Sequence, residues 1–255
     1  MTRTWRFVRY WLDALDEHSL QAPFIFDFYQ EVLNNKSLST SMNEVKKLRE
    51  SLLNNHQQIK VTDFGTGGTK SRARSISGMA RKSHQPKVSR MLFNICRKYS
   101  PKSILELGTN LGLSTLSMAA GAQQAEIVTV EGCPEISQLA QKHFSALNLS
   151  HIELVTGNLD KVLPQVLSRL NTIDLLFIDA NHRYEPTAKY FEQCLPYCHA
   201  QSIVVIDDIY HSSEMERAWD GIKQHPYTKI TVDLFQAGLV FFNPHLSKTH
   251  YVLQF

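Results

Sequence analysis

Residues 103–115 have the sequence SILELGTNLGLST, and this stretch decides the predicted fold. Ser103–Leu107 is a short apolar run without alternation, which predicts a strand buried on both faces. Gly108 allows the chain to turn sharply after the strand, and Gly112 permits a tight passage into the apolar helix that follows. The spacing is G-x-x-x-G, whereas a dinucleotide-binding fold has G-x-G-x-x-G. The segment therefore predicts a strand, a ligand-facing loop and a helix.

The rest of the C-terminal part repeats this alternation. Further strands are predicted at residues 126–130, 152–155, 173–178 and 202–206, with helices at 114–120, 134–147, 161–170, 187–194 and 214–224. Strands that alternate with helices form parallel sheets through right-handed crossovers. Residues 229–235 and 238–242 are joined by a short link, which predicts a closing antiparallel hairpin. The fold class is therefore α/β, with a mostly parallel, seven-stranded, Rossmann-like sheet that ends in this hairpin.

The first hundred residues have a different pattern. Helical spacing predicts helices at residues 5–15, 22–33 and 42–53, and we expect residues 1–99 to form a helical cap with a basic, glycine-containing lid. Residues 100–255 then form the ligand-binding domain. The cap holds aromatic residues that we expect to form its core and to wall a substrate pocket: Trp5, Trp11, Phe24, Phe26, Phe28 and Tyr29.

Charge is unevenly distributed along the chain. The net charge is +3, yet residues 70–103 contain ten Lys or Arg and no Asp or Glu. This block could attract phosphate or carboxylate groups, or it could form a solvated face. It lacks the interleaved aromatics of a single-strand nucleic-acid surface, so nucleic acid is not an expected partner.

Composition limits the class of protein. The chain has 255 residues, of which 43% are hydrophobic, and no window approaches eighteen consecutive apolar residues. The start has no secretory apolar run, so we expect a cytoplasmic protein with no membrane partner. The four cysteines match neither a redox pair nor a zinc knuckle and are expected as reduced thiols: Cys96, Cys133, Cys194 and Cys198.

Polar residues follow the first three predicted strands of the sheet. Ser114 and Thr115 can cap the first helix and offer hydroxyls to an anion at its positive end. Glu131, which follows the second strand, can accept both hydroxyls of a ribose. Asn158 follows the third strand, where an adenine edge would lie. The three loops together predict a nucleoside-binding site.

The runs ILELGTNLGLST, VTVEG, GNLDKVLP, LLFIDANHRYEP and VVIDDIYHS, in this order, resemble the class I S-adenosylmethionine-dependent methyltransferases. Among these, the chain is most similar to the catechol and caffeoyl-CoA type of small-molecule O-methyltransferases. The resemblance covers residues 100–245 and implies an S-adenosylmethionine-binding domain over residues 100–255.

The resemblance implies a cofactor-binding set. Glu106, Gly108, Asn110 and Gly112 would surround the methionine part, and Ser114 would hold its carboxylate. Glu131 would hold the ribose, while Asn158 and Leu159 would border the adenine. Thr109 and Asp179 complete the expected set.

A second glycine-rich stretch, VTDFGTGG at residues 61–68, also looks like such a loop. The residues before it are too polar for a buried strand, and those after it cannot begin an apolar helix. We therefore expect a segment that closes over the pocket, with Gly65, Gly67 and Gly68 as hinges.

The residues that act on the methyl acceptor are expected after the fourth and fifth predicted strands. In metal-dependent relatives, an Asp after the fourth strand and an Asp-Asn pair after the fifth bind magnesium. Asp179, Asp207 and Asp208 stand at these positions, so the expected metal ligands would hold Mg²⁺ or another divalent cation. His182 stands where those relatives have a catalytic Lys.

Two mechanisms follow from these residues. A metal could orient the acceptor while His182 takes its proton, or His182 could act alone beside Asp179. His211 is a second candidate base.

The expected function is methylation of a hydroxyl on a small molecule, which the basic block suggests is anionic. Two alternatives stay open at this point, an RNA methyltransferase and a non-catalytic cofactor-binding module. The acceptor and the oligomeric state are not specified by the sequence, and a homodimer is kept among the expected assemblies.

Overall fold

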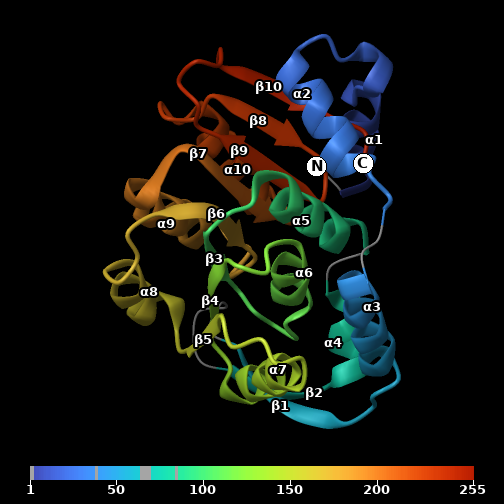
Figure 1. Ribbon diagram of the computed structural model, residues 1–255, viewed down its shortest axis with the longest axis vertical. Helices are drawn as coiled ribbons and strands as arrows, with labels where there is room; N and C mark the ends of the chain where they lie inside the picture. The colour runs from blue at the N-terminus through green and yellow to red at the C-terminus, as the bar shows by residue number, and fades with distance from the viewer. Residues whose placement is uncertain (1–2, 38–39, 64–69, 84–85) are drawn as a thin grey trace. The chain divides into compact units, whose positions relative to one another are not determined.

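The computed structural model describes residues 3–37, 40–63, 70–83 and 86–255. The chain is divided into two compact units (Figure 1). The terminal unit comprises residues 1–33 and 166–255, and the central unit comprises residues 34–165. No helix within the described ranges is both long enough and apolar enough to cross a membrane.

The central unit is built on three parallel strands in the order β3-β4-β5. Its elements along the chain are α3 (Thr40–Leu53), β1 (Gln58–Asp63), β2 (Lys70–Ser75), α4 (Ile76–Lys82), α5 (Pro86–Tyr99), β3 (Ser103–Leu107), α6 (Leu113–Gly121), β4 (Glu126–Glu131), α7 (Pro134–Ala146), β5 (Ile152–Thr156) and the start of α8 (Leu159–Leu167). Four of the five residues of β3 are buried, as the unbroken apolar run predicted.

The terminal unit contains five strands in the order β10-β8-β9-β7-β6. Its elements are α1 (Arg3–Asp13), a 3₁₀ turn (Glu17–Ser19), α2 (Pro23–Phe28), a π-helical turn (Tyr29–Leu33), β6 (Ile173–Ile178), α9 (Tyr184–Cys194), a 3₁₀ turn (Leu195–Tyr197), β7 (Cys198–Asp207), α10 (Ser213–Gln224), β8 (Ile230–Asp233), β9 (Ala237–Phe241) and β10 (Thr249–Val252). β6 and β7 are parallel, whereas β9 is antiparallel to both β7 and β8.

The predicted α/β fold is confirmed. The described residues contain every strand of the predicted sheet, and β8 and β9 form the expected antiparallel hairpin. The terminal unit also contains a strand that the sequence did not predict, β10, which pairs in parallel with β8. Two of its four residues are exposed and the other two only half-buried, so it lacks the apolar run by which the inner strands were found.

The helices predicted before residue 100 are present as α1, α2 with its π-helical turn, and α3. Two further helices, α4 and α5, were not predicted, because their basic residues interrupt the apolar pattern. In α5 all residues from Met91 to Cys96 are nevertheless buried, while Lys87 and Arg97 are exposed. The first helices belong to the terminal unit and α3–α5 to the central unit. The division into a cap of residues 1–99 and a domain of residues 100–255 stays a prediction.

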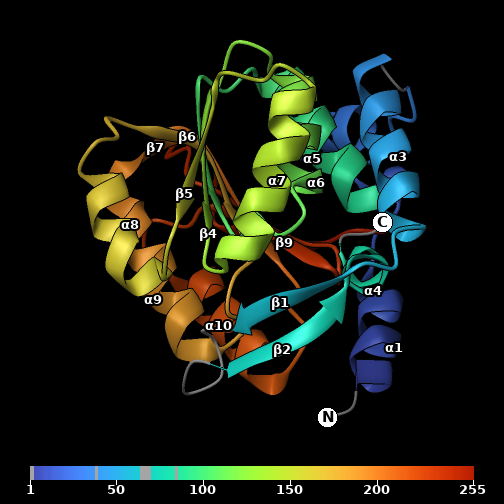
Figure 2. The same ribbon diagram turned by 90° about the horizontal axis from the view of Figure 1, so that it is seen from below.

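Residues 58–63, at the start of the second glycine-rich stretch, form strand β1, which was not predicted. β1 pairs with β2 in an antiparallel hairpin, which Figure 2 shows beside α7. Most of the side chains of β1 are exposed or half-buried, so the prediction that this polar segment cannot be a buried strand agrees with its position. The Thr62 N–H donates to Cys133 Sγ at 3.3 Å, and this bond ties β1 to the start of α7. Gly65, Gly67 and Gly68 lie outside the described residues.

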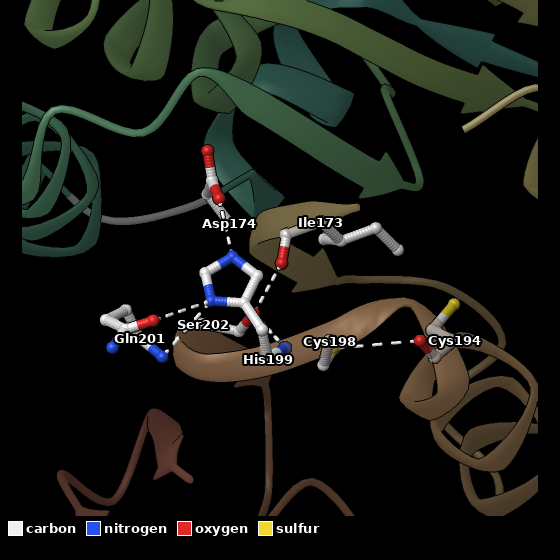
Figure 3. A network of polar contacts seen from close by, with 7 residues as sticks. All are labelled: Ile173, Asp174, Cys194, Cys198, His199, Gln201 and Ser202. Atoms are coloured by element: carbon white, nitrogen blue, oxygen red, sulfur yellow. Dashed lines mark hydrogen bonds and ion pairs between the residues drawn. The ribbon is translucent and has the colours of Figure 1, made fainter. Parts of the chain in front are cut away.

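A polar network holds an irregularity at the start of β7 (Figure 3). The register with β6 shifts between Ile173 and Leu175. His199 Nε2 lies 2.7 Å from Asp174 Oδ1, and the Ser202 hydroxyl donates to the Ile173 carbonyl at 2.5 Å. These bonds satisfy polar groups that the shifted ladder leaves without strand partners.

All four cysteines are free thiols, as expected. Burial raises the pKa of Cys96, Cys194 and Cys198, which keeps these thiols protonated. Cys194 and Cys198, the closest pair in sequence, are linked only by a weak hydrogen bond, in which Cys198 Sγ donates to the Cys194 carbonyl at 3.6 Å.

The packing of α5 against α6 depends on a residue without a side chain. A Cβ at Gly121 would lie 2.4 Å from the Phe93 carbonyl oxygen and 2.7 Å from Cys96 Cβ. We expect Gly121→Ala to destabilise the protein by about 1–3 kcal/mol, the cost of overpacking a rigid contact. Thermal or urea unfolding measures this change.

Gly221→Ala is the matched control, because no atom lies within 4 Å of a Cβ placed there. Gly221 lies inside α10, where alanine should stabilise the helix by about 0.5–1 kcal/mol. Equal effects of the two substitutions would contradict the packing argument.

Candidate functional site

The loop after β3 has a backbone that requires glycine. Gly108 and Gly112 have φ angles of 107° and 81°, and Gly112 caps the start of α6. A Cβ at Gly112 would also lie 2.7 Å from the ring of Phe144. Asn110, between them, takes a left-handed φ of 48°. The loop predicted from its glycines is therefore sharply turned and closely packed, as a ligand-binding loop at a strand end must be.

Below this loop lies the fully buried carboxylate of Glu106. Three hydroxyls donate to it: Ser114 at 2.5 Å, Thr129 at 2.6 Å, and Thr115. Thr109 is also buried, and its hydroxyl lies 2.6 Å from that of Thr129. A buried charge is tolerated only when its oxygens are hydrogen-bonded, and here the bonds join β3, α6 and β4.

This network bears on the role expected of Ser114. Its hydroxyl hydrogen is directed at Glu106, inside the protein. The hydroxyl oxygen can still accept a hydrogen bond, but it has no second hydrogen to offer an anion. The role of Ser114 toward a ligand carboxylate stays a prediction.

Glu131 lies where β4 ends, and both of its carboxylate oxygens are oriented by backbone groups. Oε2 accepts the N–H of Asn110 at 2.8 Å, and Oε1 accepts the N–H of Cys133 at 2.8 Å. Each carboxylate oxygen can accept more than one hydrogen bond. The side chain is thus held at a fixed angle at the end of β4.

The loop after β5 is tied to the same edge. The Gly157 N–H donates to the Glu131 carbonyl at 2.9 Å. Asn158 Oδ1 accepts the Asp160 N–H at 2.9 Å, and Leu159 begins α8. The structure therefore brings together the three loops that the sequence predicted as one binding edge, although which ligand atoms they contact stays a prediction.

His143 is a residue of this edge that the sequence did not reveal. It lies on α7, and its Nδ1 is 3.0 Å from the Leu111 carbonyl oxygen inside the glycine loop. Burial lowers the pKa of His143, and the bond to Leu111 only partly offsets this effect. No sequence pattern links two residues that are 32 positions apart, so this contact emerges only from the fold.

The second group of candidate residues belongs to the terminal unit. Asp179 follows β6, and its Oδ1 lies 3.4 Å from Nε2 of His182. Asn181 and His182 have positive φ angles of 68° and 42°. Asn181 donates to the Tyr190 hydroxyl at 3.0 Å, while its buried Oδ1 has no hydrogen-bond partner among the described residues. Strained backbone and a buried unused acceptor are features of ligand sites.

The loop after β7 forms a similar Asp–His pair. Asp208 has a φ of 53°, and its Oδ2 lies 3.6 Å from Nδ1 of His211. Its other oxygen is 3.9 Å from the guanidinium of Arg3. The rings of His182 and His211 are 5.7 Å apart, which places the two Asp–His pairs side by side. Arg3, which comes from α1, was not predicted at this site.

The arrangement of these carboxylates does not support the predicted divalent-cation site. Asp179 faces His182, Asp208 faces Arg3 and His211, and Asp207 is almost fully buried at the end of β7. Within the described ranges, no group of three or more His, Cys, Asp or Glu is placed to hold a metal ion. The guanidinium of Arg3, 3.9 Å from Asp208, offsets part of the repulsion between these carboxylates.

The chain is similar to several known proteins. A family model described as a methyltransferase domain matches residues 105–209. A catechol O-methyltransferase of Niastella koreensis is 31% identical over 136 residues, which are 52% of this chain and 61% of that protein. The chain therefore matches less than two thirds of this curated relative.

Solved structures share the fold at low identity. An O-methyltransferase of Bacillus cereus in complex with SAH has a TM-score of 0.57 at 18% identity, over 86% of this chain and 97% of that one. An SAH-bound methyltransferase of Podospora anserina has a TM-score of 0.61 at 16% identity, over 88% of this chain and 97% of that one. These likenesses confirm the predicted Rossmann-like fold.

The contact of His143 with the glycine loop predicts a pH-dependent stability. The neutral imidazole is favoured in the folded chain, so its stabilisation is complete above the ordinary histidine pKa of about 6.5 and is lost as the pH falls below it. His143→Gln should therefore cost about 1 kcal/mol near pH 7.5 and less at pH 5. Urea unfolding at both pH values measures the difference.

His18→Gln is the control, because 85% of the His18 side chain is exposed. Its effect should be small at both pH values. A cost of His143→Gln that stays constant between pH 7.5 and pH 5 would contradict the assignment.

Proposed function

We propose that this chain is a class I S-adenosylmethionine-dependent methyltransferase that transfers the methyl group of S-adenosylmethionine to a hydroxyl of a small molecule. The observation that carries the proposal is the Glu131 carboxylate, fixed by two backbone N–H groups beside the glycine loop. The family likeness indicates the reaction type, and the side chains described above supply the matching chemistry.

The residues of the central unit fit the cofactor. Glu131 would accept the two ribose hydroxyls, since backbone N–H groups orient both of its oxygens at the end of β4. The turned backbone at Gly108, Asn110 and Gly112 would border the methionine part, because the two glycines have no side chain to exclude it. Asn158 and Leu159 would border the adenine.

When bound, S-adenosylmethionine supplies a methyl group on a sulfonium, which an oxygen nucleophile displaces in line. The chain must then orient the acceptor hydroxyl and remove its proton. His182 is the proposed base, because an imidazole changes charge near neutral pH and a backbone in a rare conformation holds this one. Asp179, 3.4 Å away, would orient the ring and stabilise the imidazolium that forms.

The pairing of the carboxylates favours the mechanism without a metal. Asp179 and Asp208 each face a histidine, and Asp208 also faces Arg3. In our proposal Asp179 stabilises the imidazolium that forms when His182 takes the proton, instead of coordinating a cation. No step of the proposed mechanism passes through a metal.

The acceptor is proposed as a small hydroxylated molecule, since the matched relative is named a catechol O-methyltransferase. The basic residues of α5 do not define a second candidate function. Arg97 donates to the Ser37 hydroxyl at 3.0 Å and borders an apolar helix face, which agrees with a solvated surface. An anionic acceptor, a homodimer and a cytoplasmic location stay predictions.

Glu131→Ala tests the cofactor site by isothermal titration with S-adenosylmethionine. Loss of a charged hydrogen-bond acceptor should weaken binding about 10- to 100-fold. Glu126→Ala, at the exposed opposite end of β4, should bind as the wild type does. Undiminished affinity in a folded Glu131→Ala protein would refute the ribose assignment.

His182→Ala tests the base. We expect the methylation rate with a catechol acceptor to fall about 10²- to 10⁴-fold, as for the loss of a general base, while cofactor affinity stays unchanged. His211→Ala should have a smaller effect, because the proposal assigns proton removal to His182.

The same assay separates the two mechanisms that the sequence left open. Activity should be the same in EDTA and in Mg²⁺. A loss of turnover in EDTA that Mg²⁺ restores would instead place a metal among Asp179, Asp207 and Asp208.

A further inference from the structure

Helix α1 turns its polar side toward the protein. Arg6 is 6% exposed, and its Nε donates to Glu216 at 2.6 Å. Tyr10 is also buried, and its hydroxyl donates to the Leu253 carbonyl at 2.6 Å. Arg6, Tyr10 and Asp13 line a polar cavity of about 140 Å³ within the terminal unit.

The opposite side of α1 exposes large apolar side chains. Trp5 is 66% exposed, Trp11 63%, Leu12 70% and Val8 39%. At 3.6 residues per turn, these four positions lie on one face. Phe7, on the border of this face, packs edge-to-face on Phe235 with ring centroids 5.1 Å apart. The usual amphipathic arrangement is therefore reversed, with polar residues inward and apolar residues outward.

This exposed face is unusually large for a single helix. Aromatic side chains can bury about 150–250 Å² each, so the face offers on the order of 500 Å² of apolar surface. Contiguous patches of this size on a monomer are often functional. A stable protein–protein interface, however, buries about 800 Å² on each partner. The helix face alone does not reach that area, so a second copy would have to contact further surface.

Composition and charge point to a lipid surface. Two tryptophans lie on the apolar face. Arg9, whose side chain is 71% exposed, lies at the border of this face and 3.9 Å from Asp13, whereas Arg3 lies on the other side of the helix, near Asp208. Helices that lie in a membrane interface combine such an apolar face with arginines that attract anionic headgroups. Tryptophan is enriched at this depth of the bilayer.

We propose that α1 is an interfacial helix that docks the protein on an anionic membrane surface, with Val8, Trp11 and Leu12 inserted between the headgroups. The helix would lie on the bilayer and not cross it. This proposal replaces the expectation from the sequence that the protein has no membrane partner, which considered only membrane spans and secretory signals.

The test is flotation of the full-length protein with vesicles of phosphatidylcholine and phosphatidylglycerol at a 3:1 ratio, and with vesicles of phosphatidylcholine alone. The wild type should float with the anionic vesicles and bind the neutral ones several-fold more weakly. Tryptophan emission should shift to the blue on binding, because two of the three tryptophans lie on this face and Trp219 is already buried. The double variant Trp11→Ser, Leu12→Ser should lower the partition coefficient about tenfold.

Tyr227→Ser is the matched control, since Tyr227 is 66% exposed and lies outside α1 in the same unit. It should float as the wild type does. Thermal unfolding of all three proteins should coincide, because the substituted side chains are exposed. The proposal is overturned if the wild type does not bind anionic vesicles, or if the double variant binds them equally well. It is also overturned if sedimentation shows a wild-type dimer that the double variant converts to monomer, because a second copy would then cover the face.

Discussion

The carboxylate of Glu106 is a buried charge that must be satisfied, and the hydroxyls that satisfy it come from α6 and β4. Removing such an acceptor would leave Ser114, Thr115 and Thr129 without their partner in the protein interior. The same bonds set the angle at which the chain leaves β3. The turned loop above Glu106 then presents the Asn110 N–H to Glu131, so the geometry of the loop depends on this buried carboxylate.

The candidate residues divide between the two compact units. Those assigned to the cofactor lie in the central unit, where strand ends, backbone N–H groups and glycines form one connected edge. Those assigned to the acceptor lie in the terminal unit, where two Asp–His pairs follow neighbouring strands. In both units the binding groups follow strand ends, as expected for open α/β sheets. In the terminal unit these loops hold left-handed backbone conformations at Asn181, His182 and Asp208.

Local features of the fold could be predicted because they depend on neighbours in sequence. The buried strand at Ser103–Leu107 and the glycine at position 112 are examples, since an apolar run and a backbone angle are local properties. From the sequence, Glu131 and Asn110 could be expected only to lie close together. The hydrogen bond between them depends on the folded geometry of both loops.

Other contacts could not be predicted, because they join distant parts of the chain. His143 reaches Leu111, and Arg3 reaches Asp208 across most of the sequence. Helix α5 was missed because basic side chains on its exposed edge hid an apolar face. Trp5 and Trp11 were expected in the core of a cap, and the structure exposes them, since amphipathic spacing does not reveal which face points inward.

The terminal unit is assembled from two segments that are distant in sequence. The Leu15 N–H donates to the Val252 carbonyl at 2.8 Å, so the first segment is held only once the second is in place. The central unit is continuous in sequence and can complete its own contacts first. Until the second segment folds, Arg6 and Tyr10 lack Glu216 and Leu253, so nothing on the inward side of α1 fixes the orientation of the helix.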